Sequence, residues 1–339
     1  MSYTSQDAGH GKITAQIHSN QVEFPVLAYT YPLKLLSPRM QQERVGVVYM
    51  MTYGGGLVGG DRISLTINIE HDARLVLLSQ VLLSKVWSLG TIITRFVMLQ
   101  GSTKVFKTRS GARAAVRSAP SKPNDPTTTT TQRLDVSIAT GGALFLLPDP
   151  VTCFRDAAYH QVQTFRLTHG ASAALLDWYT SGRRARGEEW VFAEYYSANE
   201  VFVGGVRTAR DVVLLNGRAA ASDGAGAGAG AGGQLLLPRR TALADRMRPY
   251  ACYATVLLYG PLVQGVVREL EERMEKISVF RVGEPLDVLW SMSGVHGDAG
   301  GRVVRVAGRE TEEVKMWLCN ALRGLVDVIG AEVYSKAFV

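Results

Sequence analysis

The densest cluster of chemically suggestive residues is the glycine-rich segment 54–61, which reads GGGLVGGD. Its glycines fit the formal pattern GxGxxG, which in a dinucleotide site requires a strand before the glycines and a helix after them. Here a strand-like alternation follows, and Asp61 stands where a phosphate-binding loop needs lysine after Gly60. The segment therefore predicts a tight turn or a close backbone approach that delivers Asp61 to the start of a strand.

A second cluster, GRRARGEEW, covers residues 182–190. One interpretation is a charged surface turn. In another, Glu188 and Asp177, which lies five residues before Gly182, place carboxylates on facing walls. Carboxylates without a closed ligand set suit weak, exchangeable binding of a divalent cation. A third interpretation makes Asp177 and Glu188 the paired carboxylates of an all-β carbohydrate-active enzyme, whose mechanism depends on a distance that sequence separation does not give.

Other catalytic signals are missing from the sequence. It contains no GxSxG elbow, and its six histidines have neither HxH nor HxxxH spacing. The three cysteines Cys153, Cys252 and Cys319 are odd in number and far apart, which excludes a disulfide scaffold and a CxxC zinc site and suits a reducing compartment. We therefore expect no preformed tetrahedral metal site and no catalytic nucleophile.

The net charge of +7 is dispersed, without a basic stripe or an aromatic–basic repeat, so nucleic acid is not an expected partner. The first twelve residues are polar, which argues against a secretory signal. One apolar stretch, 81–100, is long enough to cross a bilayer, but Lys85 and Arg95 lie inside it. Each would cost about 2.5–3.5 kcal/mol near a bilayer centre, so a membrane is not expected either. The predicted location is the cytoplasm.

The elements that must position these residues are mainly strands. Residues 61–70 alternate Ile63, Leu65, Ile67 and Ile69 with polar side chains, which is typical of a half-buried strand. Similar strands are predicted at 74–79, 104–108, 134–139, 143–147, 161–167, 190–195, 201–206, 211–215 and 287–292. The helical period appears only at about 262–277 and 310–329. The predicted fold class is mainly β, with two α-helices.

Three segments are unlike a core. Residues 118–132 are rich in Ser, Pro and Thr, and 222–233 form a Gly-Ala run, so both are predicted insertions in connections. For the apolar stretch 81–100, a pair of ordinary strands is one interpretation. We also hypothesise that it is a translated intron, because it begins with Val (codon GTN), ends with Gln (which CAG encodes) and keeps the reading frame. Its removal joins Ser79-Gln80 to Gly101-Ser102.

Together, these motifs resemble the urease accessory protein D family, called H in some bacteria, in a eukaryotic, fungal-type form. The resemblance rests on GGLVGGD at 55–61, GSTKVF at 101–106, LLPDP at 146–150 with Phe154, Gly182-Arg183, Gly187-Glu188 and the last amphipathic helix. It covers residues 20–339 as one domain, with an N-terminal tail at 1–19. The stretch 81–100 interrupts a region that is continuous in the family.

The resemblance implies a β-helix-like arrangement of stacked sheets and no catalysis. It implies a urease maturation chaperone that bridges apo-urease and the accessory proteins F and G, the latter a GTPase. The cargo is a transient nickel ion, delivered through an internal polar passage, and no organic cofactor is implied. Matched positions are Asp61, Asp177 and Glu188 as acidic groups, Lys104 as a basic group, and Gly55, Gly56, Gly59, Gly60, Gly182, Arg183 and Gly187 as the passage motif. A purely structural interaction module remains a further alternative.

Overall fold

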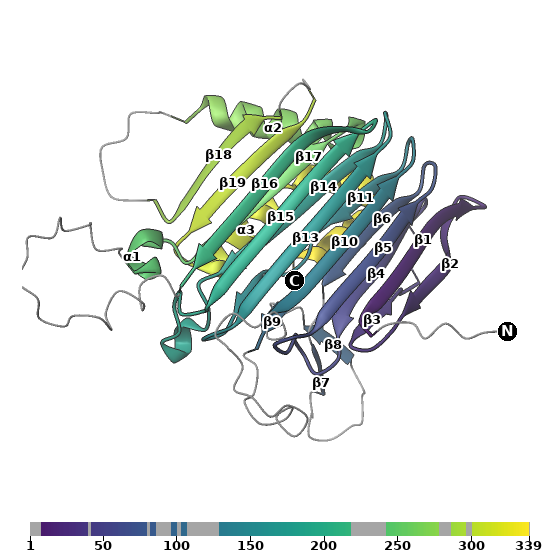
Figure 1. The fold of residues 1–339 in the computed structure, drawn as a ribbon. Coiled ribbons are helices and arrows are strands. Elements are labelled where there is room, and N and C mark those ends of the chain that lie inside the picture. The colour runs from purple at the N-terminus through teal and green to yellow at the C-terminus, as the bar shows by residue number, and fades with distance from the viewer. Residues whose placement is uncertain are drawn as a thin grey trace, which may run out of the picture.

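Two large β-sheets packed face to face form the body of the molecule, and Figure 1 shows them as parallel layers. The computed structural model describes residues 8–39, 42–79, 82–85, 96–99, 103–106, 129–217, 242–277, 286–295 and 300–338.

The seven-stranded sheet is parallel in its middle and antiparallel at both edges. In spatial order its strands are β16 (Val206–Asn216), β15 (Glu194–Val203), β13 (Ala158–Leu167), β10 (Thr130–Ile138), β5 (Arg62–Ile69), β1 (His10–His18) and β2 (Gln21–Tyr29). Side chains of β10 and β13 alternate between buried and accessible positions, because only one face of this sheet meets the other sheet.

The ten-stranded sheet lies against it. In spatial order its main path is β18 (Val288–Gly294), β19 (Arg302–Gly308), β17 (Cys252–Tyr259), β14 (Ser172–Thr180), β11 (Ala143–Leu146), β6 (Arg74–Ser79), β4 (Val45–Thr52) and β3 (Leu33–Leu36). The short strands β12 (Val151–Cys153) and β9 (Thr103–Val105) extend it beside β14.

The chain winds between the two sheets as a coil. Strands β4, β6, β11 and β14 of one sheet alternate along the sequence with β5, β10, β13 and β15 of the other. Within each of these two sets, consecutive strands pair in parallel. This winding confirms the predicted mainly β, β-helix-like fold.

Four of the described helices cover the outer face of the ten-stranded sheet. Figure 1 shows α2 (Gln264–Glu275) and α3 (Thr311–Ala321) on the side of the ten-stranded sheet. With α4 (Val326–Ile329) and α5 (Ala331–Ala337) they bury the outer face of that sheet, where Val256 and Leu258 pack against Val266 and Leu318 in one cluster. A short helix, α1 (Leu243–Met247), precedes β17. None of the described helices is long and apolar enough to cross a membrane.

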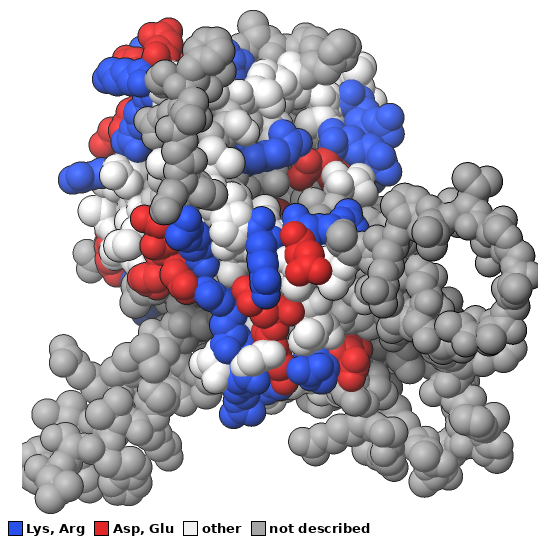
Figure 2. Space-filling view, turned by 90° about the vertical axis from the view of Figure 1, so that its left-hand side faces the viewer, with Lys and Arg blue, Asp and Glu red and all other residues white. Residues whose placement is uncertain are grey.

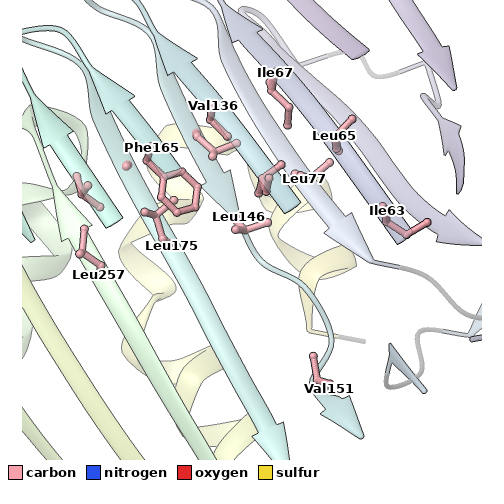
Figure 3. Close-up of a cluster of buried hydrophobic side chains, with 14 of the residues drawn as sticks. Ile63, Leu65, Ile67, Leu77, Val136, Leu146, Val151, Phe165, Leu175 and Leu257 are labelled. Atoms are coloured by element: carbon pink, nitrogen blue, oxygen red, sulfur yellow. The ribbon is translucent and has the colours of Figure 1, made fainter. Parts of the chain in front are cut away.

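The space between the sheets holds a second apolar cluster. Figure 3 shows its aliphatic part, where Ile63, Leu65 and Ile67 of β5 face the ten-stranded sheet beside Leu77 and Leu146. The alternation that predicted the strand at 61–70 is therefore confirmed, since these isoleucines and leucines are fully buried while Thr66 is exposed.

Several predicted boundaries are wrong. The expected tail at 1–19 contains β1, a strand whose stability comes from long-range pairing with β2 and β5. The end of the expected loop 118–132 belongs to β10, which begins at Thr130. In the expected strand 190–195 only the last two residues are extended, because Trp190 adopts a positive φ of 57°.

The two predicted helices are present with altered ends. Residues 261–263 form a 3₁₀ turn before α2. The second helix breaks after Ala321, and Gly330, with a φ of 85°, separates α4 from α5, a helix that the sequence analysis missed.

Part of the stretch 81–100 forms a separate hairpin. Leu82–Lys85 (β7) pairs antiparallel with Phe96–Leu99 (β8), and neither strand joins the two large sheets. The remainder of that stretch, residues 118–128 and the run 222–233 lie outside the described residues.

Candidate functional site

The inner face of the seven-stranded sheet changes from aliphatic to polar towards β16. In register across the strands, Ile63 of β5 lies beside Gln132 of β10, followed by Gln161 of β13 and Ser197 of β15. Neighbours in register share a face of the sheet. The buried face that carries Ile63 and Leu65 on β5 therefore carries Gln161 on β13. Gln161 is 3% exposed, so its amide must find partners inside the protein.

Asp177 supplies those partners from the opposite sheet. Its carboxylate accepts hydrogen bonds from Gln161 Nε2 (3.1 Å), Ser197 Oγ (2.6 Å) and Asn199 Nδ2 (2.7 Å). Burial raises the pKa of Asp177, the three hydrogen bonds oppose that rise, and the charge of Asp211 adds to it. Asp177 on β14 thus connects the two sheets through a hydrogen-bond network on β13 and β15.

The network continues to Tyr159, and the comparison with the adjacent Tyr195 offers a direct test. Tyr159 Oη donates to Gln161 Oε1 (3.0 Å), whereas the buried Tyr195 Oη has no hydrogen-bond partner among the described residues. Tyr159→Phe is expected to lower the free energy of unfolding by about 1–2 kcal/mol, because Gln161 loses its donor. Tyr195→Phe should change it by less than about 0.5 kcal/mol. Urea denaturation measures both, and equal losses would contradict the assignment.

Next to this network, in the same inter-sheet space, further buried polar atoms lie among aromatic rings, and they have no hydrogen-bond partner in the described residues. The centre of the Tyr179 ring lies 4.6 Å from the ring centre of Tyr195, 5.8 Å from that of Tyr253 and 6.4 Å from that of Trp190. Trp190 Nε1 and Ser181 Oγ are buried without a hydrogen-bond partner in the described part of the chain. Such atoms call for water or another polar ligand, so a polar line extends from Asp177 towards the loop after β14.

That loop, residues 182–188, carries the predicted charged motif. Arg183 binds Glu188 through two hydrogen bonds (2.8 and 2.5 Å), and its guanidinium stacks 3.9 Å from the ring centre of Phe154. The hydrogen bond from Arg183 is the main cause that lowers the pKa of Glu188. Gly182 (φ 127°) and Gly187 (φ 69°) both adopt the left-handed backbone that makes this turn possible.

The glycine-rich segment meets this loop through two aromatic rings. Leu57 N donates to Lys104 O and Phe106 N donates to Leu57 O (both 2.8 Å), which joins the segment to β9. The ring of Phe106 then packs edge-on against Phe154, 4.9 Å away. The predicted motifs therefore lie together at one end of the sandwich; they contain Gly55, Gly56, Gly59, Gly60, Lys104, Arg183 and Glu188. Strand β5 follows the glycines directly, as the sequence predicts.

The three candidate carboxylates are held separately. Asp61 accepts from Val58 N (2.8 Å) within its own turn, Asp177 bonds to the inter-sheet amides, and Glu188 bonds to Arg183. Among the described residues, no three His, Cys, Asp or Glu side chains come together to hold a metal ion. The paired-carboxylate interpretation gains no support from this geometry, because Asp177 and Glu188 belong to different networks.

The sequence analysis missed the partners of Asp177, which are Gln161, Ser197 and Asn199. A signal for them exists: in β13 the residues Gln161 and Gln163 fall on the same alternating face as Tyr159 and Phe165. An amide on the buried face of a strand predicts an internal partner.

These features define a class of protein, a two-layer β scaffold with a polar interior. A family model described as UreD urease accessory protein matches residues 8–81 and 94–336. The chain therefore belongs to the UreD urease accessory protein family, and its role is accessory to urease and non-enzymatic, within urease maturation.

Similar proteins carry matching names. The chain is 32% identical to urease accessory protein 4 of Cryptococcus neoformans var. grubii over 341 residues, covering 97% of this chain and 94% of that protein. It is 30% identical to urease accessory protein D of Arabidopsis thaliana, covering 90% and 92% of the two chains. An uncharacterized urease accessory protein ureD-like of Schizosaccharomyces pombe is 36% identical over 170 residues, half of this chain and 46% of its own.

The family match skips residues 82–93, inside the stretch hypothesised to be a translated intron. We expect the mature transcript to lack the codons for 81–100, and the chain without them to be at least as stable as the full chain, because β7 and β8 pair with neither large sheet. Sequencing of the spliced message and a thermal melt of both chains test this. A mature message that encodes 81–100 would contradict the hypothesis.

Proposed function

We propose that this chain bridges apo-urease and the accessory proteins F and G, and that nickel passes transiently along its inter-sheet polar layer towards the urease active site. The observation that carries the proposal is the layer itself. It runs from the loop of Glu188 to the network of Asp177, past the polar atoms of Ser181, Trp190 and Tyr195 that have no hydrogen-bond partner among the described residues. Isolated oxygen donors release a divalent ion readily, which suits a carrier that must hand over its cargo.

The surroundings of each candidate residue fit this role in different ways. Asp177 is the carboxylate within the layer, while Glu188 and Lys104 lie at its loop end, near the glycine-rich turn that ends at Asp61. The hydrogen bond from the Arg183 guanidinium lowers the pKa of Glu188 and holds the loop in place, so Glu188 can bind a cation only if Arg183 moves away. The three free thiols of the chain suit a reducing compartment, and we assign the protein to the cytoplasm.

Reconstitution tests the proposal. Urease subunits and the accessory proteins F and G are expressed with and without this chain, and the nickel content of purified urease is measured. We expect nickel loading only when the chain is present, and tagged protein F should retain urease only in its presence. Equal nickel content in both preparations would refute the delivery role.

A purely structural module is the second candidate, favoured by the fact that Asp177 and Glu188 already have partners within the chain. It predicts that the assembled complex loads nickel regardless of the inter-sheet side chains. Substitution of Asp177 separates the two functions, because it changes the inter-sheet layer without changing the outer surface.

A further inference from the structure

One ion pair joins the two sheets at the edge formed by β16 and β19. Arg305 Nη2 of β19 donates to Asp211 Oδ1 of β16 at 2.8 Å. The side chain of Asp211 is only 16% exposed, whereas that of Arg305 is 53% exposed. Figure 2 shows this side of the molecule, where acidic and basic side chains lie interleaved. The carboxylate of Asp211 is therefore mostly buried, whereas the guanidinium of Arg305 that pairs with it is partly in solvent.

Asp211 adjoins the network of Asp177. Asp211 lies in register with Asn199, whose Nδ2 donates to Asp177. Burial is the main cause that raises the pKa of Asp177, and the charge of Asp211 adds to that rise. On the opposite sheet, Asp177, Thr255 and Arg305 form one row in register. Two carboxylates and a hydroxyl thus line the same stretch of the inter-sheet space, which opens to solvent at Arg305.

A second observation points to a ligand here. Tyr195 is 1% exposed, lies on the same face of β15 as Ser197 and Asn199, and its hydroxyl has no hydrogen-bond partner in the described residues. Burial is the main cause that raises the pKa of Tyr195, and the charge of Asp177 adds to it, so the hydroxyl stays protonated. A buried hydroxyl without a protein partner is suited to a hydrated cation, because it hydrogen-bonds the water that the cation carries.

We propose that this edge is a port for a divalent cation, lined by Asp177, Asp211 and Thr255, and that the guanidinium of Arg305 is a tethered cation that closes it. An incoming ion displaces Arg305 from Asp211, and Asp177 is the inner carboxylate that receives the ion. The identity of the cargo rests on the proposed function. Displacement is favourable because a half-exposed ion pair is weak, whereas a divalent ion interacts with both carboxylates at once.

The contrast with Arg183 supports this division of roles. Arg183 makes two hydrogen bonds to Glu188 and stacks on Phe154, and it is 29% exposed. Arg305 has one hydrogen bond to its acid and no ring beneath it in the described structure. Arg183 is therefore fixed, and Arg305 is the arginine of this layer that can move.

The test is cation binding to the purified full chain. Mn²⁺ is the probe, because it prefers oxygen ligands and avoids the six histidines, and electron paramagnetic resonance counts the free ion. We expect Arg305→Gln to bind Mn²⁺ at least tenfold more tightly than the wild type, with Ni²⁺ displacing it. Adding Asp211→Asn to that variant should abolish the gain.

The matched control is Arg302→Gln on the same strand, whose side chain pairs with Glu271 of α2 on the helical side of the sheet. It removes the same charge and should leave Mn²⁺ affinity unchanged. Arg305→Lys keeps the positive charge and should bind like the wild type, so it serves if the glutamine variant fails to fold. An Arg305→Gln affinity equal to that of the wild type, or a Lys variant that binds as tightly as a folded Gln variant, overturns the port.

Failure of the port and failure of the proposed function are separable. If Arg305→Gln gains no Mn²⁺ affinity but urease loading still requires the chain, the port is wrong and nickel delivery stands. If the gain appears and is lost with Asp211→Asn while urease loads without the chain, the port stands and the delivery role fails.

Discussion

Replacing Asp177 with asparagine is expected to reduce the rate at which urease acquires nickel at least tenfold, while the chain remains folded. Asparagine keeps the shape of the side chain but removes its charge and turns one acceptor into a donor that faces Ser197 and Asn199. The stability cost should be about 1–2 kcal/mol, because two donors then compete for one oxygen. Nickel content of urease in the reconstituted system measures the first effect, and urea denaturation measures the second.

The control for this substitution is Asp135→Asn. Asp135 is a carboxylate of β10 on the outer face of the seven-stranded sheet, 43% exposed and 3.4 Å from Arg166. It loses the same charge without touching the inter-sheet layer, so nickel loading should not change. Normal loading by a folded Asp177→Asn chain would favour the purely structural module over nickel passage.

The second large effect is expected from Gly182→Val, which should lower the free energy of unfolding by about 2–4 kcal/mol. Gly182 has a φ of 127°, a backbone conformation that β-branched residues avoid. A Cβ at this position would lie 2.7 Å from the carbonyl oxygen of Glu188, which is backbone and cannot rotate away. The loop that holds Arg183 against Glu188 must therefore shift. Thermal and urea denaturation measure the loss.

Gly187→Asn serves as the comparison. Gly187 adopts a φ of 69°, asparagine tolerates that region, and nothing lies within 4 Å of a Cβ added there. Its cost should stay below about 1 kcal/mol. If Gly182→Val proved as mild as Gly187→Asn, the close contact between residues 182 and 188 would not constrain the loop.

Local alternation predicted β5, a strand that is buried on one face. The pattern of Ile63 to Ile69 needs no tertiary knowledge, because the solvent-facing side chains of β5 are polar. The same logic failed for β14 and β17, whose residues are buried on both sides by the second sheet and by the helices. A strand buried on both faces reads as an apolar run without a period, so only some of these strands were predicted: β6 and β11 were, and β14 and β17 were not.

The candidate site was also predictable only in part from the sequence. Gly182, Arg183, Gly187 and Glu188 are close in sequence, and their spacing was enough to single out the loop that the structure contains. The network around Asp177 was not predictable from spacing, because Gln161 lies 16 residues before it and Asn199 lies 22 residues after it. Its geometry follows from the parallel register of β13 and β15, which is a property of the whole winding.

The alternation of successive strands between the two sheets has a consequence for how such a protein changes over time. Each circuit of the chain finds its neighbours through main-chain pairing within its own sheet, so the corners between circuits carry little of the specificity. The hairpin of β7 and β8 leaves from such a corner, between β6 and β9, and both flanking strands keep their places. Such a corner can therefore be lengthened or trimmed, by mutation or by altered splicing, without breaking the strand pairing within either sheet.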